Sequence, residues 1–353
     1  MNAPERDAAK KRMKMNSYRI FLLIICFWLT TAAAIAQEPM PTESGFSGYI
    51  EILGAYISTN SQLNTDSDNK KTDSLDTSGK RVNKFRPLPL GLLSYTFAEI
   101  RTQLFMGVLP ENVAQGQFLV EAGARHILSN GTGLRASVIP LTPIAQKTWK
   151  DPFVIGKDRQ RTDIDSYGFK LAAETILGTG LTLKYGWMRQ TIDDEESGTF
   201  LLSQPNTFLT PGDLKDLNRD AHIHRLTSEY SFKIGRRVRL TPILGYTRSN
   251  ADGDANSFYA LRPELSFLYF GNQLQASVNV SANAQWYDSK NPVFDKTRRE
   301  FNPGLFAMLG YKNPFGFNNF RVDWFNAFFK SNSNIDFYES CNFITALGLG
   351  YTF

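Results

Sequence analysis

The chain has 353 residues, of which 42% are hydrophobic and 21% charged, and its formal net charge is +5. A mean hydropathy of -0.29 excludes a bundle of membrane-spanning helices, because each such helix needs about 20 consecutive apolar residues. The length is ample for one large core or one barrel.

Residues 1–36 have the composition of a secretory signal peptide. The apolar run FLLIICFWL at Phe21–Leu29 follows a basic segment, is too short to cross a bilayer, and leads to Ala34-Ile35-Ala36. This order is typical of a leader that is removed, and we expect cleavage after Ala36; an uncleaved anchor helix is the alternative. The leader holds six basic and two acidic residues, so the mature chain keeps a net charge of +1. Nucleic-acid binding thereby loses its compositional support.

The cysteines predict a chain without internal disulfides. Cys26 lies in the leader, so Cys341 has no partner in the mature chain. A lipoprotein site at Cys26 is excluded, because the bulky Ile25 stands where a small residue is needed. Stability must come from another source.

After a short periplasmic segment at 37–44, strand patterns rich in Tyr, Phe, Val, Leu and Thr recur from 45 to 353. We predict fourteen strands, with twelve as the alternative because 100–128 has the weakest pattern. The predicted ranges are 45–58, 85–97, 100–109, 117–128, 133–143, 163–177, 181–192, 221–234, 237–249, 257–270, 273–287, 298–311, 319–331 and 340–353.

One stretch shows the alternation most clearly. QLQASVNVSANAQW, at Gln273–Trp286, places an apolar residue at every even position and Gln, Ser or Asn at every odd one. Such a strand has one apolar and one polar face. In a soluble sandwich the apolar face meets a second sheet, whereas in an outer-membrane barrel it meets lipid and the polar face lines a lumen.

The gaps between strands favour the barrel. Tight gaps such as Ser129–Thr132, Gly178–Gly180 and Gly235-Arg236 hold residues that tolerate positive φ. Longer loops at 144–162, 193–220, 250–256, 288–297 and 332–339 alternate with them. Short periplasmic turns and long external loops alternate in this way in bacterial outer-membrane barrels.

Within each predicted strand the charged residues share one parity, opposite the large apolar residues. Exclusion of charge from a lipid face is expected, because Arg or Lys at the midplane costs about 2–4 kcal/mol. We predict that eleven basic and six acidic side chains turn inward, namely Arg101, Arg125, Arg135, Lys170, Lys184, Arg225, Lys233, Arg237, Arg239, Arg262 and Arg321 with Glu51, Glu121, Glu174, Glu229, Glu264 and Asp323. This excess predicts a mildly cationic interior that favours anions in an open pore, or cross-lumen pairs that plug it; a barrel of this size leaves both open.

The C-terminus carries a further signature. Leu347, Leu349, Tyr351 and Phe353 alternate with small or polar residues. A terminal Phe after such a pattern resembles the closing strand of outer-membrane barrels, which the insertion machinery recognises. The partners implied are periplasmic chaperones and insertion machinery during biogenesis, then outer-membrane lipid and lipopolysaccharide. All signals agree on an all-β, transmembrane, antiparallel up-and-down barrel in the outer membrane of a Gram-negative bacterium.

Several segments, specific only as a set, resemble one family. They include NTDSDNKKTDSL, PLGLLSYTF, DPFVIGKDRQRTD, DDEESG, ADGDANSFY, NPVFDKTR and SNIDFYES. Together they are similar to proteobacterial proteins catalogued only as a domain of unknown function, over 45–353. The resemblance implies an envelope barrel and no activity.

Residues that suggest catalysis are scattered. His126 and Ser129 resemble the His and Ser of outer-membrane phospholipase A, but a spacing of three points them to opposite faces of a strand. His222 and His224 share one face, yet zinc needs three or four ligands. Rim residues that touch lipopolysaccharide or water are the alternative.

Two acidic loop segments suggest cation binding or proteolysis. Asp66–Asn69 has oxygen-rich spacing but lacks the Gly and Glu of an EF-hand loop. Asp193–Glu196 invites comparison with surface proteases that use acidic pairs, without a partner His. Hydrated external loops are the simpler interpretation of both.

The leading functional hypothesis is therefore a porin-like passive or selective channel for a small solute. The alternatives are a surface enzyme that hydrolyses lipid or peptide, and a plugged barrel with a structural or binding role. We expect no catalytic set, no metal and no cofactor.

Overall fold

The computed structural model describes residues 40–110, 113, 120–139 and 146–353. The predicted signal peptide at 1–36 lies outside these residues, and β1 begins at Gly45. Among the described residues no helix is long and apolar enough to span a membrane.

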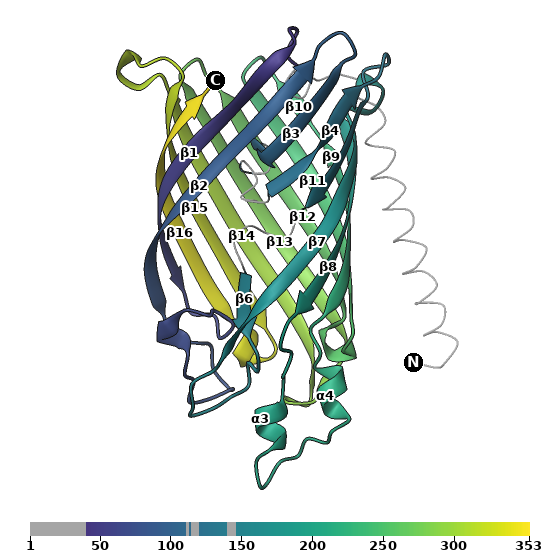
Figure 1. Cartoon of the computed structure of the whole chain (residues 1–353), viewed down its shortest axis with the longest axis vertical. Coiled ribbons are helices and arrows are strands. Elements are labelled where there is room, and N and C mark those ends of the chain that lie inside the picture. Colours follow the sequence, from purple (N-terminus) through teal and green to yellow (C-terminus); the bar gives the residue numbers. More distant parts are fainter. Residues whose placement is uncertain (1–39, 111–112, 114–119, 140–145) are drawn as a thin grey trace, which may run out of the picture.

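The described chain forms one closed antiparallel barrel of fourteen strands (Figure 1). The segments are β1 (Gly45–Thr59), β2 (Val82–Phe97), β3 (Thr102–Val108), β4 (Val120–Ile127), β5 (Gly133–Ile139), β6 (Gln146–Trp149), β7 (Arg161–Glu174), β8 (Leu181–Ile192), β9 (Ala221–Tyr230), β10 (Phe232–Ile234), β11 (Val238–Ala251), β12 (Phe258–Phe270), β13 (Leu274–Asn291), β14 (Lys296–Lys312), β15 (Phe320–Ser333) and β16 (Ser340–Thr352). Both β5 and β6 pair with β7, and both β9 and β10 pair with β11, so each couple counts as one interrupted strand. The barrel closes where β1 pairs with β16.

Turns and loops lie at opposite ends of the barrel. Tight turns such as those at Gly131 and Gly235 have positive φ values of 82° and 65°, which glycine adopts without steric cost. The opposite end carries the long connections, including two short helices, α3 (Thr199–Leu202) and α4 (Asp213–Asp216) (Figure 1). The predicted alternation of short turns and long loops is confirmed along most of the barrel; around β14 it fails, because the connection 292–295 at the loop end is shorter than 313–319 at the turn end. We call the loop end external.

Several predicted boundaries are wrong. The predicted loop 288–297 shrinks to 292–295, because β13 continues to Asn291 and β14 begins at Lys296. The predicted strand 163–177 ends at Glu174, because Thr175 and Leu177 have φ values of 46° and 54° and form the turn to β8. The predicted loop 144–162 contains β6, which extends the wall beside Arg161–Ile164. Alternation alone assigns β-branched residues of a turn to a strand. It also misses a short strand that follows an interruption.

The faces of the strands are sorted by polarity. In β13 the outward Val280 is 54% exposed, whereas the inward Ser277 is fully buried. Aromatic pairs flank the apolar outward surface, with Tyr259 stacked on Trp286 near the external end and Phe320 against Tyr351 near the turns. An apolar belt between two aromatic girdles is the surface that a bilayer covers.

This belt predicts a depth-dependent penalty for charge. Val280→Lys, near the middle of β13, is expected to reduce the free energy of unfolding by about 2–4 kcal/mol, because the ammonium would enter hydrocarbon. Leu274→Lys, at the turn end of the same strand, is the matched control, with an expected cost of about 0–1 kcal/mol. Urea unfolding in lipid vesicles measures both. Equal costs would contradict a bilayer-covered belt.

The first half of β2 is paired on one side only among the described residues. β2 pairs with β1 from Val82 to Thr96 but with β3 only from Leu92 to Phe97. Gly48 exchanges both backbone hydrogen bonds with Phe353, on the β16 side of β1. In an antiparallel ladder successive residues direct their backbone groups to alternate sides. With the register between β1 and β2, the backbone nitrogens of Pro87 and Pro89 therefore point away from β1. Proline has no N–H, so both positions suit a strand edge that lacks a ladder partner among the described residues.

Candidate functional site

Two buried clusters of ion pairs lie on the inner face of β4, β5 and β7. Glu174 is 1% exposed and accepts two ion pairs of 2.9 Å, from Arg125 Nε and Arg135 Nη2. Glu121 accepts from Lys170 Nζ at 2.5 Å and from the Ser137 hydroxyl. Each carboxylate is buried and compensated, which is the condition under which charge is tolerated inside a protein.

Further pairs continue around the wall. Lys184 contacts Glu229 at 2.7 Å between β8 and β9, and Arg262 contacts Glu264 at 2.8 Å along β12. Arg225 lies half-buried between these pairs on the inward parity of β9.

A third cluster joins the first and last parts of the chain. Arg321 on β15 contacts Asp323 Oδ2 at 2.5 Å and Glu51 Oε2 at 3.2 Å. Glycines make room for these groups, because a Cβ at Gly310 would lie 2.5 Å from Asp323 Oδ1 and one at Gly348 would lie 2.7 Å from Glu51 Oε1.

Three of the predicted inward charges lie at the turn end. Lys233 and Arg237 are exposed where β10 and β11 meet, and Arg237 donates to Asn272 of the neighbouring turn. Arg101 is in the turn between β2 and β3 with φ 49°, so its predicted inward position is wrong. Parity fails where the chain leaves the strand. Arg239 lies deeper, over the ring of Phe270 at 5.1 Å.

Part of the inner wall is apolar, which the alternation does not predict. A cluster on β14, β15, β16, β1, β2, β3 and the segment after β3 packs inside the barrel, and its buried members are Tyr49, Leu53, Ala55, Leu90, Val108, Val113, Phe306, Phe325, Ala327 and Ala346. The Tyr49 hydroxyl donates to the Val108 carbonyl at 2.7 Å. The interior therefore combines charged clusters with an apolar patch, and the two share strands β1 and β15.

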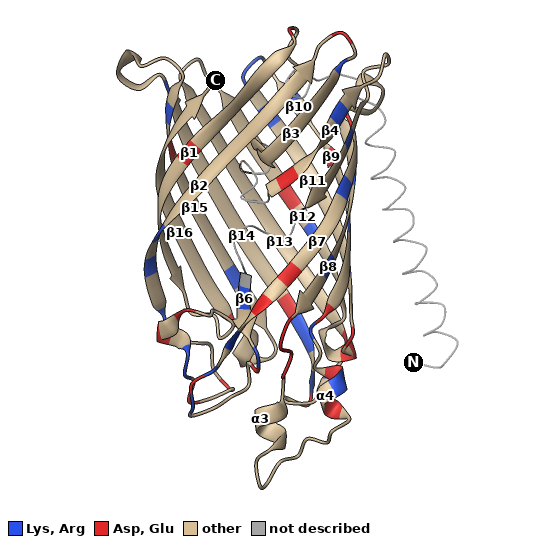
Figure 2. Ribbon diagram, viewed as in Figure 1, with Lys and Arg blue, Asp and Glu red and all other residues tan. Residues whose placement is uncertain are grey.

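Among the described residues, two of the larger cavities lie inside the barrel, one toward each end. The external cavity has about 290 Å³ and lies beneath the loops, with Phe153, Arg219 and Tyr287 in its wall. The cavity toward the turns has about 540 Å³ and is lined by residues of β1–β5 and of β11–β16. Charged wall residues appear in Figure 2 as separate bands among neutral strand segments.

The external loops pack on one another. A hydrophobic cluster contains residues from the loops after β1, β6, β8, β13 and β15, namely Leu75, Phe153, Leu209, Leu217, Val293, Ile335, Phe337 and Tyr338. Phe153 and Phe337 have ring centroids 5.4 Å apart. The loops thus share a small core of their own above the lumen.

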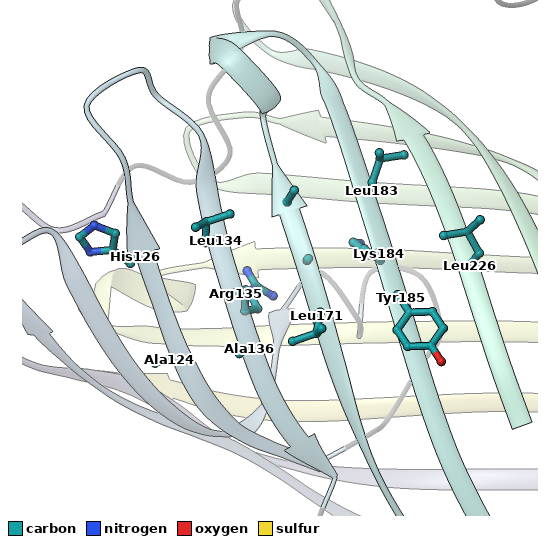
Figure 3. Close-up of a pocket in the computed structure, with 12 residues that line it drawn as sticks. Ala124, His126, Leu134, Arg135, Ala136, Leu171, Leu183, Lys184, Tyr185 and Leu226 are labelled. Atoms are coloured by element: carbon teal, nitrogen blue, oxygen red, sulfur yellow. The ribbon is translucent and has the colours of Figure 1, made fainter. Parts of the chain in front are cut away.

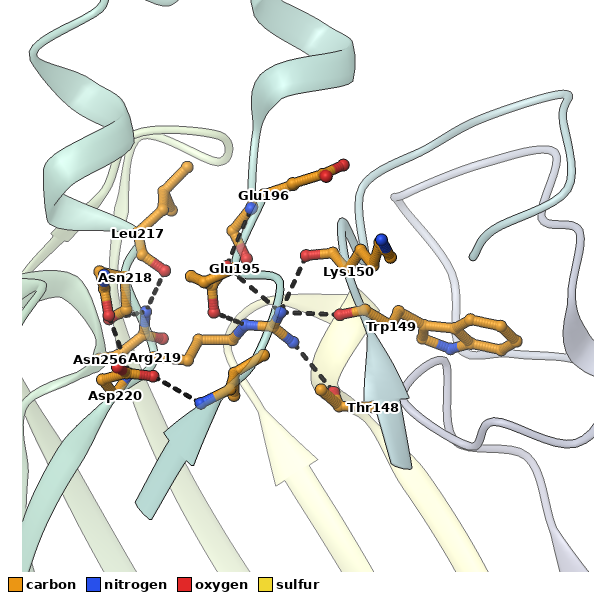
Figure 4. A network of polar contacts seen from close by, with 12 residues as sticks. Thr148, Trp149, Lys150, Glu195, Glu196, Leu217, Asn218, Arg219, Asp220 and Asn256 are labelled. Carbon is orange, nitrogen blue, oxygen red and sulfur yellow. Dashed lines mark hydrogen bonds and ion pairs between the residues drawn. The ribbon is translucent and has the colours of Figure 1, made fainter. Parts of the chain in front are cut away.

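Arg219 ties two of these loops together (Figure 4). Its guanidinium donates to Glu195 Oε2 at 2.6 Å, to Thr148 Oγ1 at 3.0 Å and to the carbonyls of Trp149 and Lys150 at 2.7 and 3.0 Å. The loop before β9 is thereby fixed to the end of β6. A planar donor that satisfies a carboxylate and two carbonyls suits this role.

A second buried arginine joins the first long loop to the wall. Arg159 donates to the carbonyl of Gln62 at 2.9 Å and lies over the Trp149 ring at 4.6 Å. Burial lowers the pKa of Arg159 to about 10, because desolvation disfavours the charged form.

The residues that suggested metal binding or proteolysis have other partners. Asp66 and Asp68 both contact Lys84, at 3.3 and 2.7 Å. In the second acidic segment, Asp194 contacts Lys150 and Glu195 holds Arg219. In the described part of the chain no group of His, Cys, Asp and Glu residues could hold a metal ion.

The histidines lie on the outward face. His126 faces a shallow outward hollow of about 560 Å³ with Leu134, Leu171 and Leu226 (Figure 3). Its Nδ1 lies 2.9 Å from the Thr102 hydroxyl, and Ser129 follows in the turn. The structure therefore does not bring His126 and Ser129 together.

His222 and His224 belong to the external aromatic girdle. His222 stacks on Trp187 at 5.8 Å, and His224 Nδ1 lies 2.8 Å from the Tyr185 hydroxyl. These contacts place both rings on the outward face toward the external rim of the barrel.

Sequence reasoning missed the core of the loops and its arginine ties. A signal was present, because PFVI, NPVF and NIDFY place Phe153, Val293, Ile335 and Phe337 in segments that are otherwise polar. Apolar residues within long external loops predict that the loops bury them together.

Comparisons with known proteins give low-identity likenesses to barrels. The outer membrane channel DcaP of Acinetobacter baumannii is 11% identical, with 91% of this chain and 100% of that chain covered at a TM-score of 0.42. OmpTdeltaL8, a loop L8 deletion mutant of OmpT, an outer membrane protein of Vibrio cholerae, is 8% identical, with 88% of this chain and 99% of that chain covered at a TM-score of 0.41. OpdQ of Pseudomonas aeruginosa is 13% identical, with 87% and 97% covered at 0.33. No curated protein matches the chain.

A family assignment rests on sequence. A family model matches residues 45–352, which is nearly the whole barrel. The chain belongs to the family described as "Protein of unknown function (DUF2860)".

Proposed function

We propose that the protein is an outer-membrane channel through which a small solute passes, with a preference for anions. The observation that carries this proposal is the pair of internal cavities, about 290 Å³ below the external loops and about 540 Å³ toward the turns, inside a wall whose outward face is apolar. Charged groups that line a pore set its selectivity.

The proposal includes the route to the membrane. Residues 1–36 act as an export signal, and the closing strand with Leu347, Leu349, Tyr351 and Phe353 is recognised by the insertion machinery. Lipid and lipopolysaccharide then cover the outward belt of a Gram-negative outer membrane. Detection of the mature chain in the outer-membrane fraction, with an N-terminus at Gln37, tests this part; an inner-membrane location would contradict it.

Conductance tests the channel itself. The purified barrel, inserted into planar bilayers, is expected to give single-channel current steps. In a KCl gradient its reversal potential is expected to lie closer to the chloride equilibrium potential than to the potassium one. The physical reason is the excess of basic groups that face the larger cavity. A buffer-matched detergent blank is the control. Verified insertion without conductance above that blank would contradict the proposal.

A further inference from the structure

The larger cavity is built across the lumen near the turn end. Its basic lining residues are Arg125 on β4, Arg135 on β5, Arg239 on β11, Lys312 on β14 and Arg321 on β15. No acidic residue contributes to the described lining. Basic side chains from both sides of the barrel therefore face one space of about 540 Å³, a volume typical of small-molecule sites.

The acids that pair with these bases are recessed into the wall. The side chains of Glu51, Glu174 and Asp323 are 0%, 1% and 2% exposed, whereas those of Arg135 and Arg321 are 13% and 19% exposed. Each base thus lies between its acid and the lumen. This layering gives the cavity a positive potential although the wall is largely neutralised.

Two like-charged pairs stand directly opposite one another in the ladders. Arg125 faces Arg135 between β4 and β5, and Lys312 faces Arg321 between β14 and β15. Like charges directly opposite are unfavourable. Lys312 forms no ion pair with a described residue, so a bound anion would relieve the repulsion at this pair.

Part of the remaining wall of the cavity is apolar, and it lies beside polar residues such as Ser94, Gln103, Gln275 and Asn313. Tyr49, Leu92 and Met308 line it from β1, β2 and β14, and they continue into the inner apolar cluster. Aromatic rings also lie against the cations, with Arg321 over Tyr49 at 5.5 Å and Arg239 over Phe270 at 5.1 Å. An inorganic anion, which has no apolar part, would leave this apolar portion of the wall without a complementary surface.

We propose that this cavity binds an organic carboxylate with an apolar body, whose carboxylate lies against the basic residues and whose body lies on the Tyr49 side. The guanidinium fork matches a carboxylate in two parallel hydrogen bonds. The inference rests on the proposed channel function and names the solute class that the channel selects.

Three probes separate the contributions of charge and apolar body. Phenylacetate has both, phenylacetamide has the body without the charge, and acetate has the charge without the body. Calorimetric titration of the folded barrel in detergent is expected to show phenylacetate binding at least about tenfold more tightly than either other probe, since hydrogen bonds to charged groups are the strong ones. Equal binding by phenylacetamide, or by acetate, would overturn the proposal.

Variants place the site. Lys312→Gln and Arg239→Gln are each expected to weaken phenylacetate binding about tenfold. Lys296→Gln removes the same charge from the external end of β14 and is expected to leave binding unchanged. Should Lys312→Gln fail to fold, Arg239→Gln and the three probes still decide. Equal effects of Lys312→Gln and Lys296→Gln would overturn the proposal.

The two proposals fail separately. A barrel that conducts ions but does not bind phenylacetate would refute the assigned solute class and leave the channel standing. A barrel that binds phenylacetate in detergent but never conducts would refute the channel. Phenylacetate is expected to reduce chloride current through the wild-type barrel and to have a weaker effect on Lys312→Gln; block of equal strength in both would count against the cavity as the binding site.

Discussion

Replacing Arg219 by methionine is expected to open the external end of the barrel. The substitution leaves the Glu195 carboxylate and the carbonyls of Trp149 and Lys150 without their shared donor. Loss of one partner from a largely buried ionic network costs about 3–5 kcal/mol. The loop before β9 should therefore detach from the end of β6, and single-channel conductance should rise severalfold.

Two measurements check this expectation. Conductance in planar bilayers reports the pore, and limited proteolysis of whole cells reports cleavage within 193–220. Arg299→Met is the matched control, because Arg299 is an exposed arginine at the same end of the barrel. Unchanged conductance and protease resistance in Arg219→Met would show that the hydrophobic cluster of the loops suffices to hold them.

Replacing Glu174 by glutamine should destabilise the wall itself. Its carboxylate is 1% exposed and compensates both Arg125 and Arg135. Glutamine keeps the shape but leaves two buried guanidinium groups facing each other, and the expected loss is about 3–5 kcal/mol in the free energy of unfolding. Urea unfolding of the barrel in vesicles measures it.

The size of this effect has an internal test. Glu99→Gln, in the exposed turn between β2 and β3, is the control and should change stability by less than about 0.5 kcal/mol. A triple variant with Glu174→Leu, Arg125→Met and Arg135→Met should recover most of the loss, because an apolar replacement of a whole buried cluster is often neutral. A triple variant no more stable than Glu174→Gln would contradict the electrostatic explanation.

The wall of the barrel could be predicted from sequence because the constraint on it is simple. Each strand separates lipid from lumen, so Gln273–Trp286 had to alternate and Val280 had to differ from Ser277. The position of the turns followed from glycine and asparagine in short gaps. The count of fourteen strands was confirmed even though β3 and β4 are short.

The contents of the lumen could not be predicted in the same way. Alternation assigns a face to Arg321 but does not say that Glu51, 270 residues earlier, is its partner. The pairing depends on barrel closure, which only the register shows. The ties made by Arg219 and Arg159 depend on how separate loops fold over one another, and no local pattern encodes that.

The ladder that joins β1 to β16 determines the order of assembly. Backbone hydrogen bonds link Gly48 to Phe353, the last residue of the chain. β1 therefore completes its pairing with β16 only after all the strands between them have been made. Until then the edges of β1 and β16 are unpaired, and an unpaired strand edge is a template for association with other chains.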